Sequence, residues 1–166
     1  MASRSNFHTA SPAAFQQMLN LEAYLEGCGF EHSLLLLIKL RASQINRCGY
    51  CIDMHSKDLR AAGEDEQRLY LLSAWNDTTF YSARERAALA WTEAVTQLGP
   101  QGVPDAVFDQ AAAQFTQREL ADLSLAVVAI NGWNRLCVAF RAPVGSYEPM
   151  PVALPAVHVV LAQPTH

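Results

Sequence analysis

The 166-residue sequence has few charged residues, few aromatic residues and no concentrated block of basic side chains. Charged residues make up 17% of the chain and aromatic residues 9%. The 12 Lys and Arg residues are scattered and are outnumbered by 16 Asp and Glu residues, which gives a formal net charge of −4. Proteins that bind nucleic acids or anionic membranes usually carry a basic patch. We therefore expect no nucleic-acid partner and no membrane partner.

Long apolar segments are also missing from the sequence. The longest aliphatic run is LLLLI at 34–38, which is far shorter than the roughly 18 residues that a membrane helix needs. The N-terminal stretch MASRSNFHTASPAAF has no apolar segment like that of a secretory signal peptide. We therefore expect a cytoplasmic protein. In that reducing compartment, a close cysteine pair is more often catalytic or metal-binding than a structural disulfide.

Helix signals, by contrast, are abundant, and they predict an all-α fold. Ser82 and Thr116 each stand three residues before a Glu, which is the pattern of a capping box. Pro12 suits the first position of a helix, where its missing N–H costs nothing. A strand-like alternation appears only in VHVVL at 157–161. The helices are predicted at about 12–26, 31–46, 48–62, 65–75, 82–98, 104–115 and 116–140.

The prolines near the C-terminus mark a change in organisation. Four prolines are spread from Pro143 to Pro155, and a fifth is Pro164, so this region cannot form one helix. We predict a helical domain at 1–147 and a proline-rich tail at 148–166 that is disordered or docked on a neighbouring subunit. The hydrophobic fraction of 51% suggests a second buried surface, such as that of a homo-oligomer.

The stretch CGYCIDMH at 48–55 carries the most chemistry. On a helix with about 100° of rotation per residue, Cys48, Cys51 and His55 fall within a face about 60° wide. The break at Asn46 and Arg47 places Cys48 near a helix N-terminus, where free N–H groups stabilise a thiolate. His55 favours Cys51 instead, so the spacing alone does not decide which thiol is the nucleophile.

Three other interpretations compete with a redox pair. A c-type haem site requires His directly after the second Cys, and Ile52 stands there. A zinc site needs a fourth ligand from Cys28, His32, Cys137 or a partner chain. The cysteines can also be small buried packing residues, which is the role we expect for Cys28 and Cys137. Because a second ligand pair is missing, redox chemistry is favoured and no metal is expected.

The sequence resembles the AhpD-like alkylhydroperoxidases of the carboxymuconolactone decarboxylase family. The resemblance covers roughly 10–147 and is most specific in the ordered set Ser43-Gln-Ile-Asn46, Cys48-x-x-Cys51 and His55. It continues through the segments WNDTTFYSARERAALAWTEAVT at 75–96 and FTQRELADLSLAVVAINGWNRLCVAFRAPVGSY at 115–147.

This resemblance implies an all-helical protein that assembles as a dimer, trimer or hexamer. Its expected activity is the reduction of organic hydroperoxides or hydrogen peroxide, with no bound cofactor. By the family pattern, Cys51 attacks the peroxide, Cys48 resolves the resulting sulfenic acid, and His55 belongs to the proton relay. A dithiol reductant, either a thioredoxin-like protein or a lipoyl protein, then restores the thiols.

The sequence departs from the family pattern at two positions. Leu36 stands where the family commonly has a relay glutamate, and Tyr50 stands where some members have His. Turnover is therefore expected to be slow unless another group serves His55. The candidates for the relay or for its support are Glu93, Tyr50, Asn46, Glu31 and Asp53. Glu93 is also suited to a surface salt bridge, and Asn46 to ending a helix in a left-handed conformation.

Two other functions remain as alternatives. Lactone decarboxylation is the other activity of the family, but it normally proceeds without the cysteine pair, so Cys48 and Cys51 argue against it. A redox sensor or binding module with little turnover would use the same pair. Turnover with a reductant separates the two, because a sensor is oxidised once and stops.

Overall fold

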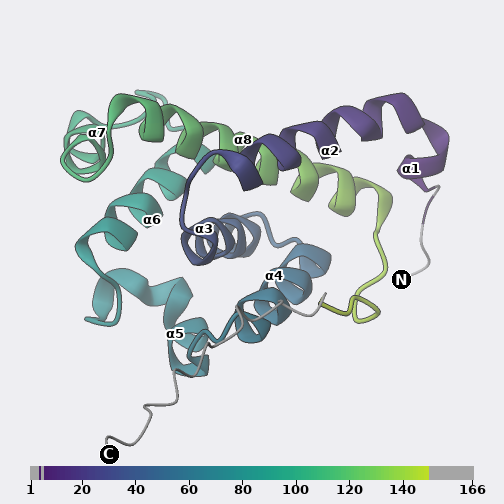
Figure 1. Cartoon of the computed structure of the whole chain (residues 1–166), viewed down its shortest axis with the longest axis horizontal. Helices are drawn as coiled ribbons and strands as arrows, with labels where there is room; N and C mark the ends of the chain where they lie inside the picture. The colour runs from purple at the N-terminus through teal and green to yellow at the C-terminus, as the bar shows by residue number, and fades with distance from the viewer. Residues whose placement is uncertain (1–3, 5, 150–166) are drawn as a thin grey trace, which may run out of the picture.

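The computed structural model describes residue 4 and residues 6–149, and these residues form an all-α fold (Figure 1). Helices account for the regular structure, and no β-strand occurs among the described residues. The helices are α1 (Phe7–Ala10), α2 (Pro12–Gly27), α3 (His32–Ile45), α4 (Gly49–Ala61), α5 (Glu66–Leu71), the 3-10 helix η1 (Leu72–Asp77), α6 (Ala83–Thr96), α7 (Asp105–Ala112) and α8 (Gln117–Phe140). The predicted fold class is confirmed.

Helix α3 lies at the centre of the molecule, in contact with α4, α6 and α8 (Figure 1). Every residue from Leu34 to Leu40 is buried, which explains why the sequence is apolar around most of this helix. Residues on opposite sides of α3 enter two different hydrophobic clusters: Leu35 and Ile38 pack with α6 and α8, while Leu36 and Leu40 pack with Leu59 of α4. Helix α3 therefore fixes α4 relative to the rest of the bundle.

Both predicted capping boxes are present. Ser82 Oγ accepts a hydrogen bond from the Glu85 amide at 3.2 Å, and the Glu85 carboxylate accepts one from the Ser82 amide at 2.7 Å. Thr116 and Glu119 form the same pair at the start of α8, with the same two distances. Pro12 is the first residue of α2 as predicted. Each of these helices therefore begins where its local sequence satisfies the free N–H groups.

Two local predictions are wrong. The helix predicted at 65–75 is divided into α5 and η1 after Leu71, and η1 is itself kinked at Ala74 (φ −119°, ψ 29°). Asn46 is not left-handed: its φ is −78°, and Arg47 next to it has φ 54°. The side-chain amide of Asn46 donates instead to Asn131 and Asn134 of α8. The left-handed residue in the turn before Cys48 is therefore Arg47.

Helix α8 is, among the described residues, the one helix long and apolar enough by composition to cross a membrane. The expectation that no segment reaches this length therefore does not hold for α8. In the fold this helix runs along the bundle in contact with α2, α3, α4, α6 and α7 (Figure 1). Leu123, Val127 and Ile130 are fully or almost fully buried, whereas Val128 and Val138 are exposed, so only part of the apolar surface of α8 belongs to the protein core.

The segment after α8 folds back along α4. The Tyr147 hydroxyl donates to Asp58 Oδ1 at 2.7 Å, and Lys57 Nζ donates to the Tyr147 carbonyl at 2.8 Å. The Gly145 amide donates to Asp53 Oδ2 at 3.2 Å. The ordered chain thus reaches at least Pro149. Residues 150–166, which hold most of the predicted tail and the VHVVL segment, lie outside the described residues, and the domain boundary at 147 stays a prediction.

Candidate active site

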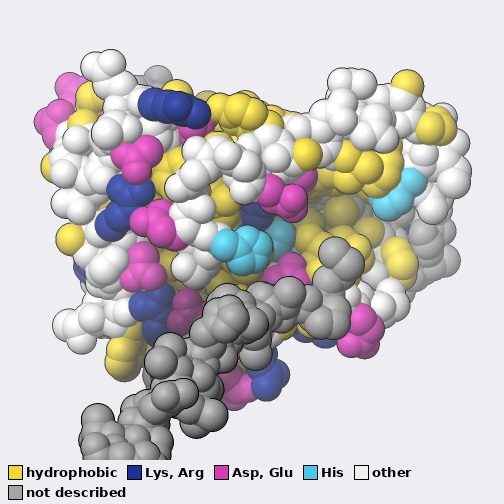
Figure 2. Space-filling view, in the orientation of Figure 1, with side chains coloured by type: hydrophobic (Ala, Val, Ile, Leu, Met, Phe, Trp, Pro, Cys, Tyr) yellow, Lys and Arg dark blue, Asp and Glu magenta, His cyan; other side chains and the backbone are white. Residues whose placement is uncertain are grey.

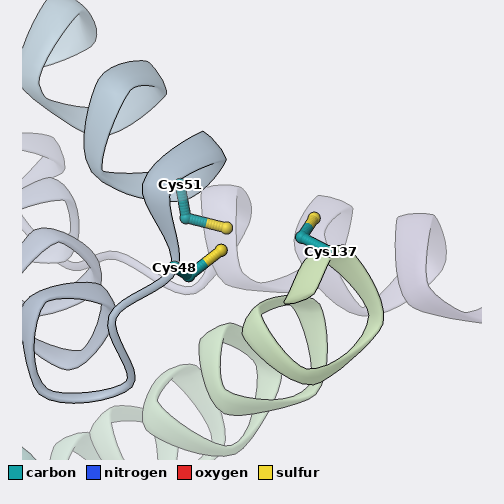
Figure 3. A group of neighbouring side chains, drawn as sticks. All are labelled: Cys48, Cys51 and Cys137. Carbon is teal, nitrogen blue, oxygen red and sulfur yellow. The ribbon is translucent and has the colours of Figure 1, made fainter. Parts of the chain in front are cut away.

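Cys48 and Cys51 lie at the start of α4. Cys48 is the residue that precedes the helix, with an extended backbone (φ −85°, ψ 96°), and Cys51 lies in the first turn. The prediction that both cysteines are helical is therefore wrong for Cys48, because the left-handed turn at Arg47 changes the chain direction just before it. The two sulfur atoms nevertheless point toward one another (Figure 3). The pair is fully reduced in this structure.

A third cysteine, Cys137 of α8, faces the same pair (Figure 3). The three Sγ atoms all lie within 4.8 Å of one another, and all three residues are buried. We expected Cys137 to be a packing residue, and its place in a sulfur cluster was missed. Nothing in the local sequence around Cys137 resembles a redox motif, so only the packing of α8 against α4 reveals the cluster.

The cluster favours a thiolate on Cys48. Hydrogen bonding from the Cys137 and Cys51 thiols lowers the pKa of Cys48 to about 3, against the opposing effect of burial. The Cys51 amide contributes to this lowering, although the neutral thiol makes no capping hydrogen bond at the usual distance. The same interactions raise the pKa of Cys51, and the neighbouring Cys48 raises the pKa of Cys137 to about 12. At neutral pH the three thiols therefore carry one negative charge, placed at a helix N-terminus.

His55 is buried at 4% exposure, yet neither of its ring nitrogens has a hydrogen-bond partner in the described part of the chain. Asp58 Oδ2 lies 3.8 Å from Nδ1, which is too long for a hydrogen bond. Burial lowers the pKa of His55, and the nearby Asp58 carboxylate only partly opposes this. The ring is therefore neutral at pH 7, with one nitrogen free to accept a proton and the other free to donate one.

A large cavity of about 800 Å³ opens beside these residues. Figure 2 shows a hollow on this face, with hydrophobic side chains in it and histidine and acidic side chains beside it. Its lining comes from α1, α2, α3, α4, α8 and the segment after α8. Cys51, Cys137 and His55 are among the lining residues, whereas Cys48 is not. A small molecule in the cavity therefore meets Cys51 before it meets Cys48.

One end of the cavity is aromatic. Phe7 and Phe15, from α1 and α2, contact the Trp133 ring of α8 at centroid distances of 6.4 Å and 5.7 Å. His8 stacks on Phe15 at 4.0 Å, and Phe140 packs against Phe7 at 5.6 Å. These side chains surround an apolar volume much larger than hydrogen peroxide.

A partly buried ion pair forms another part of the wall. Lys39 Nζ binds Glu22 Oε2 at 2.5 Å, and Trp133 Nε1 donates to Glu22 Oε1 at 2.9 Å. Leu36 lies one turn before Lys39 on α3 and also lines the cavity. A carboxylate from α2 is thus present in the cavity that contains the leucine. Sequence patterns did not single out Glu22, because it reaches the site from a different helix.

Of the predicted relay candidates, Tyr50 lies in the cavity wall and Glu93 does not. Tyr50 lines the cavity, and burial raises the pKa of its hydroxyl. The Glu93 carboxylate is not among the lining residues; it accepts hydrogen bonds from Arg41 Nε at 2.7 Å and Trp75 Nε1 at 2.6 Å.

The remaining candidates are also engaged elsewhere. The Asn46 amide donates at 2.9 Å to both Asn131 and Asn134, behind the sulfur cluster. Glu31 pairs with Arg84 at 3.1 Å. Asp53 pairs with Lys57 at 3.1 Å and accepts from the Gly145 amide, so it holds the final segment in place.

The sulfur cluster provides three ligands of the kind that zinc prefers. Within the described ranges, no His, Asp, Glu or further Cys joins the three sulfurs at the same spacing, His55 included. A closed structural zinc site has four ligands in tetrahedral positions. The described residues therefore supply three of the four that the zinc interpretation requires.

The chain is similar to known proteins in sequence and in fold. The model of the carboxymuconolactone decarboxylase family matches residues 10–94. The uncharacterized protein YdfG of Bacillus subtilis is 37% identical over 139 residues, which cover 84% of this chain and 95% of YdfG. A crystal structure from Agrobacterium tumefaciens, of a protein of unknown function provisionally assigned as the antioxidant defence protein AhpD, is 42% identical with a TM-score of 0.84, and the match covers 88% of this chain and 100% of that one.

A more distant structure shows the same fold. It is described as an alkylhydroperoxidase AhpD core, an uncharacterized peroxidase-related protein from Ralstonia eutropha JMP134. Its sequence is 18% identical to this chain and its TM-score is 0.74, over 84% of this chain and 74% of that one. At this identity the likeness concerns the fold alone.

Proposed function

This chain belongs to the carboxymuconolactone decarboxylase family, and we propose that it is a thiol-dependent peroxidase of the AhpD-like kind. It reduces organic hydroperoxides or hydrogen peroxide through Cys48 and Cys51. The observation that carries the proposal is that Cys51 lines a cavity of about 800 Å³ while its sulfur lies within 4.8 Å of the Cys48 sulfur. His55, buried and without hydrogen-bond partners, lines the same cavity.

Access and acidity favour different thiols. The peroxide meets Cys51, whereas the lower pKa belongs to Cys48. Because the thiols titrate as a coupled group, a minor form of the cluster carries the proton on Cys48 and the negative charge on Cys51, and this form reacts with the peroxide. The Cys51 thiolate then attacks the terminal oxygen of the hydroperoxide. The O–O bond breaks, Cys51 becomes a sulfenic acid, and the alkoxide leaves.

The second half of the cycle closes a disulfide. The alkoxide takes the proton now held on Cys48 and leaves as an alcohol, and we assign the transfer to the neutral His55 ring, one turn along α4 from Cys51. The Cys48 thiolate attacks the Cys51 sulfur, and the released hydroxide takes a proton from solvent to form water. A dithiol reductant, thioredoxin-like or lipoyl-bearing, then reduces the disulfide. These partners, a cytoplasmic location and a homo-oligomeric state are parts of the same proposal.

The missing relay glutamate has a partial replacement in the cavity. Glu22 stands close enough to His55 to raise its pKa, but Lys39 lowers it and binds the Glu22 carboxylate directly. A carboxylate neutralised in this way is a poor proton acceptor. We therefore expect that His55 works without a strong carboxylate partner and that turnover is slow.

The proposal is tested by measuring cumene hydroperoxide consumption with excess dihydrolipoamide. The wild-type protein consumes many equivalents, and the Cys51→Ser variant falls to the rate without protein, because the sulfur that reaches the cavity is gone. Cys28→Ser is the matched control, since Cys28 lies outside the cluster, and it keeps full activity. Full activity in Cys51→Ser would contradict the proposal, and oxidation that stops after one equivalent would identify a sensor.

A further inference from the structure

Cys137 has no role in the two-cysteine cycle, and we propose that it is a second resolving cysteine. In this role Cys137 closes a disulfide with oxidised Cys51 and thereby links α8 to α4. The inference rests on the proposed function, because a hydroperoxide supplies the oxidation of Cys51. It adds a third thiol to the reaction and an alternative oxidised state to the protein.

The Cys137 sulfur, like the Cys48 sulfur, is a close neighbour of the Cys51 sulfur. All three Sγ atoms lie within 4.8 Å of one another, although Cys137 comes from a different helix (Figure 3). A disulfide requires sulfurs about 2.05 Å apart, so either pairing needs side-chain rotation and a small approach of the sulfurs. None of the four cysteines is already paired.

The position of the cavity favours Cys137 as the disulfide partner of oxidised Cys51. Cys51 and Cys137 both line the cavity, whereas Cys48 does not; Cys48 and Cys51 are equally buried at 1% exposure, and Cys137 is 6% exposed. A peroxide in the cavity places the sulfenic oxygen of Cys51 on the side where Cys137 stands. A disulfide between the two lining residues presents both of its sulfurs to a small dithiol in the cavity, whereas the Cys48–Cys51 disulfide presents only the Cys51 sulfur.

The loss of the negative charge on Cys48 during the reaction makes Cys137 more acidic. In the reduced protein, hydrogen bonding and charge repulsion from Cys48 raise the pKa of Cys137 to about 12, so Cys137 stays a neutral thiol. Once Cys48 is protonated or joined in a disulfide, this cause disappears and the pKa of Cys137 falls. Cys137 therefore becomes a better nucleophile after Cys51 has been oxidised.

Two balanced reactions lead to the new disulfide. In the first, the Cys137 thiol attacks the Cys51 sulfenic acid: the S–S bond forms, the S–O bond breaks, and hydroxide leaves with the thiol proton as water. In the second, the Cys137 thiolate attacks Cys51 in the Cys48–Cys51 disulfide and releases the Cys48 thiolate, with no net oxidation. Both reactions move the oxidised bond to the cavity wall.

The test is a single turnover of the Cys48→Ser variant with one equivalent of cumene hydroperoxide in the presence of dimedone, which labels sulfenic acids. Peptide mapping by mass spectrometry should find Cys51 joined to Cys137. In the variant that carries both Cys48→Ser and Cys137→Ser, dimedone labelling of Cys51 should rise about tenfold, because a held thiol outcompetes a reagent in solution. The variant with Cys48→Ser and Cys28→Ser is the matched control and should retain the Cys51–Cys137 link.

Equal dimedone labelling with and without Cys137, and no cross-linked peptide, would overturn the inference while leaving the peroxidase proposal in place. If the peroxide leaves Cys51 unlabelled in every variant, the peroxidase proposal fails instead. A parallel oxidation of Cys48→Ser with diamide, which needs no peroxide chemistry, then decides the pairing. A Cys51–Cys137 link supports the disulfide, and its absence under diamide overturns it.

Discussion

The starts of α6 and α8 differ from the start of α4 in the atom that is offered to the helix. Ser82 and Thr116 present an oxygen that accepts a hydrogen bond from the helix at 3.2 Å, and each is completed by a glutamate. Cys48 occupies the same position in α4 but presents a sulfur, and its neutral thiol makes no capping hydrogen bond. The two oxygen caps lie at the surface, whereas Cys48 is buried against two other thiols.

The difference shows what one helix position can be used for. An oxygen cap satisfies the free amides permanently and stabilises the helix by roughly 1 kcal/mol. A sulfur leaves them largely unsatisfied until it is ionised, and then the amides and the neighbouring thiols stabilise the thiolate. The start of α4 therefore gives up some stability of the helix in favour of reactivity of the sulfur.

The largest effect is expected at His55, which lies on α4, the helix that begins at the reactive cysteines. Replacing it by Gln keeps a polar side chain but removes a group that exchanges protons near neutral pH. We expect kcat/KM for cumene hydroperoxide to fall by about 10²-fold, the usual scale for a general acid–base group. Steady-state kinetics of His55→Gln would measure this. An unchanged rate would mean that His55 has a structural role and takes no part in proton transfer.

Exchanging the sulfur cap for an oxygen cap tests the comparison directly. In Cys48→Ser the group that takes the Cys51 proton is lost, so the rate of Cys51 oxidation at pH 7 should fall, by up to about 10²-fold, the lower end of what a general base contributes. The free energy of unfolding should stay within about 1 kcal/mol, because serine is a good capping residue. Stopped-flow oxidation and urea unfolding measure the two quantities. A slower oxidation that is accompanied by a large loss in the free energy of unfolding would contradict a specific role for the sulfur.

A smaller change is expected when a carboxylate is added opposite the reactive helix. Leu36 lines the cavity, and Leu36→Glu places a carboxylate at the position where the family commonly has one. We expect kcat to rise, by less than about tenfold because His55 already acts alone. Steady-state turnover of Leu36→Glu and of Leu36→Gln as the neutral control measures the gain. The same rate for both would mean that another group already serves His55.

The smallest effect on activity belongs to the oxygen caps. Ser82→Ala removes the hydrogen bond to the Glu85 amide, and the free energy of unfolding should fall by about 1 kcal/mol. Turnover per folded molecule should be unchanged, because α6 contributes no residue to the cavity lining. Urea unfolding and the peroxidase assay give the two values. A loss of turnover in the folded variant would show that the capped helices also support the chemistry.

The sequence predicts local features of the fold well, because their causes are local. The capping boxes at Ser82 and Thr116, Pro12 at a helix start and the apolar run at 34–38 all act within one or two turns. The division of the helix predicted at 65–75 after Leu71 and the kink at Ala74 were missed, since no glycine or proline stands at either place.

The candidate site was predictable only in the part that lies on one helix. Cys48 and Cys51 are close in sequence and their sulfurs lie together, and His55, one turn further along α4, lines the same cavity as Cys51. Cys137 and Glu22 reach the cavity from α8 and α2, and no spacing rule connects them to the motif. Glu93 attracted attention as a lone carboxylate between apolar turns, but Arg41 and Trp75 bind it away from the cavity lining.

The central claim is that the sulfur at the start of α4 and its neighbour reduce a peroxide. The most direct measurement titrates the reduced protein with cumene hydroperoxide and counts both the alcohol formed and the thiols that remain. The account predicts one alcohol and the loss of two of the four thiols for each hydroperoxide consumed, with Cys28 still free and full recovery of the thiols by a dithiol. Loss of thiols without alcohol, or hydroperoxide left unchanged, would contradict it.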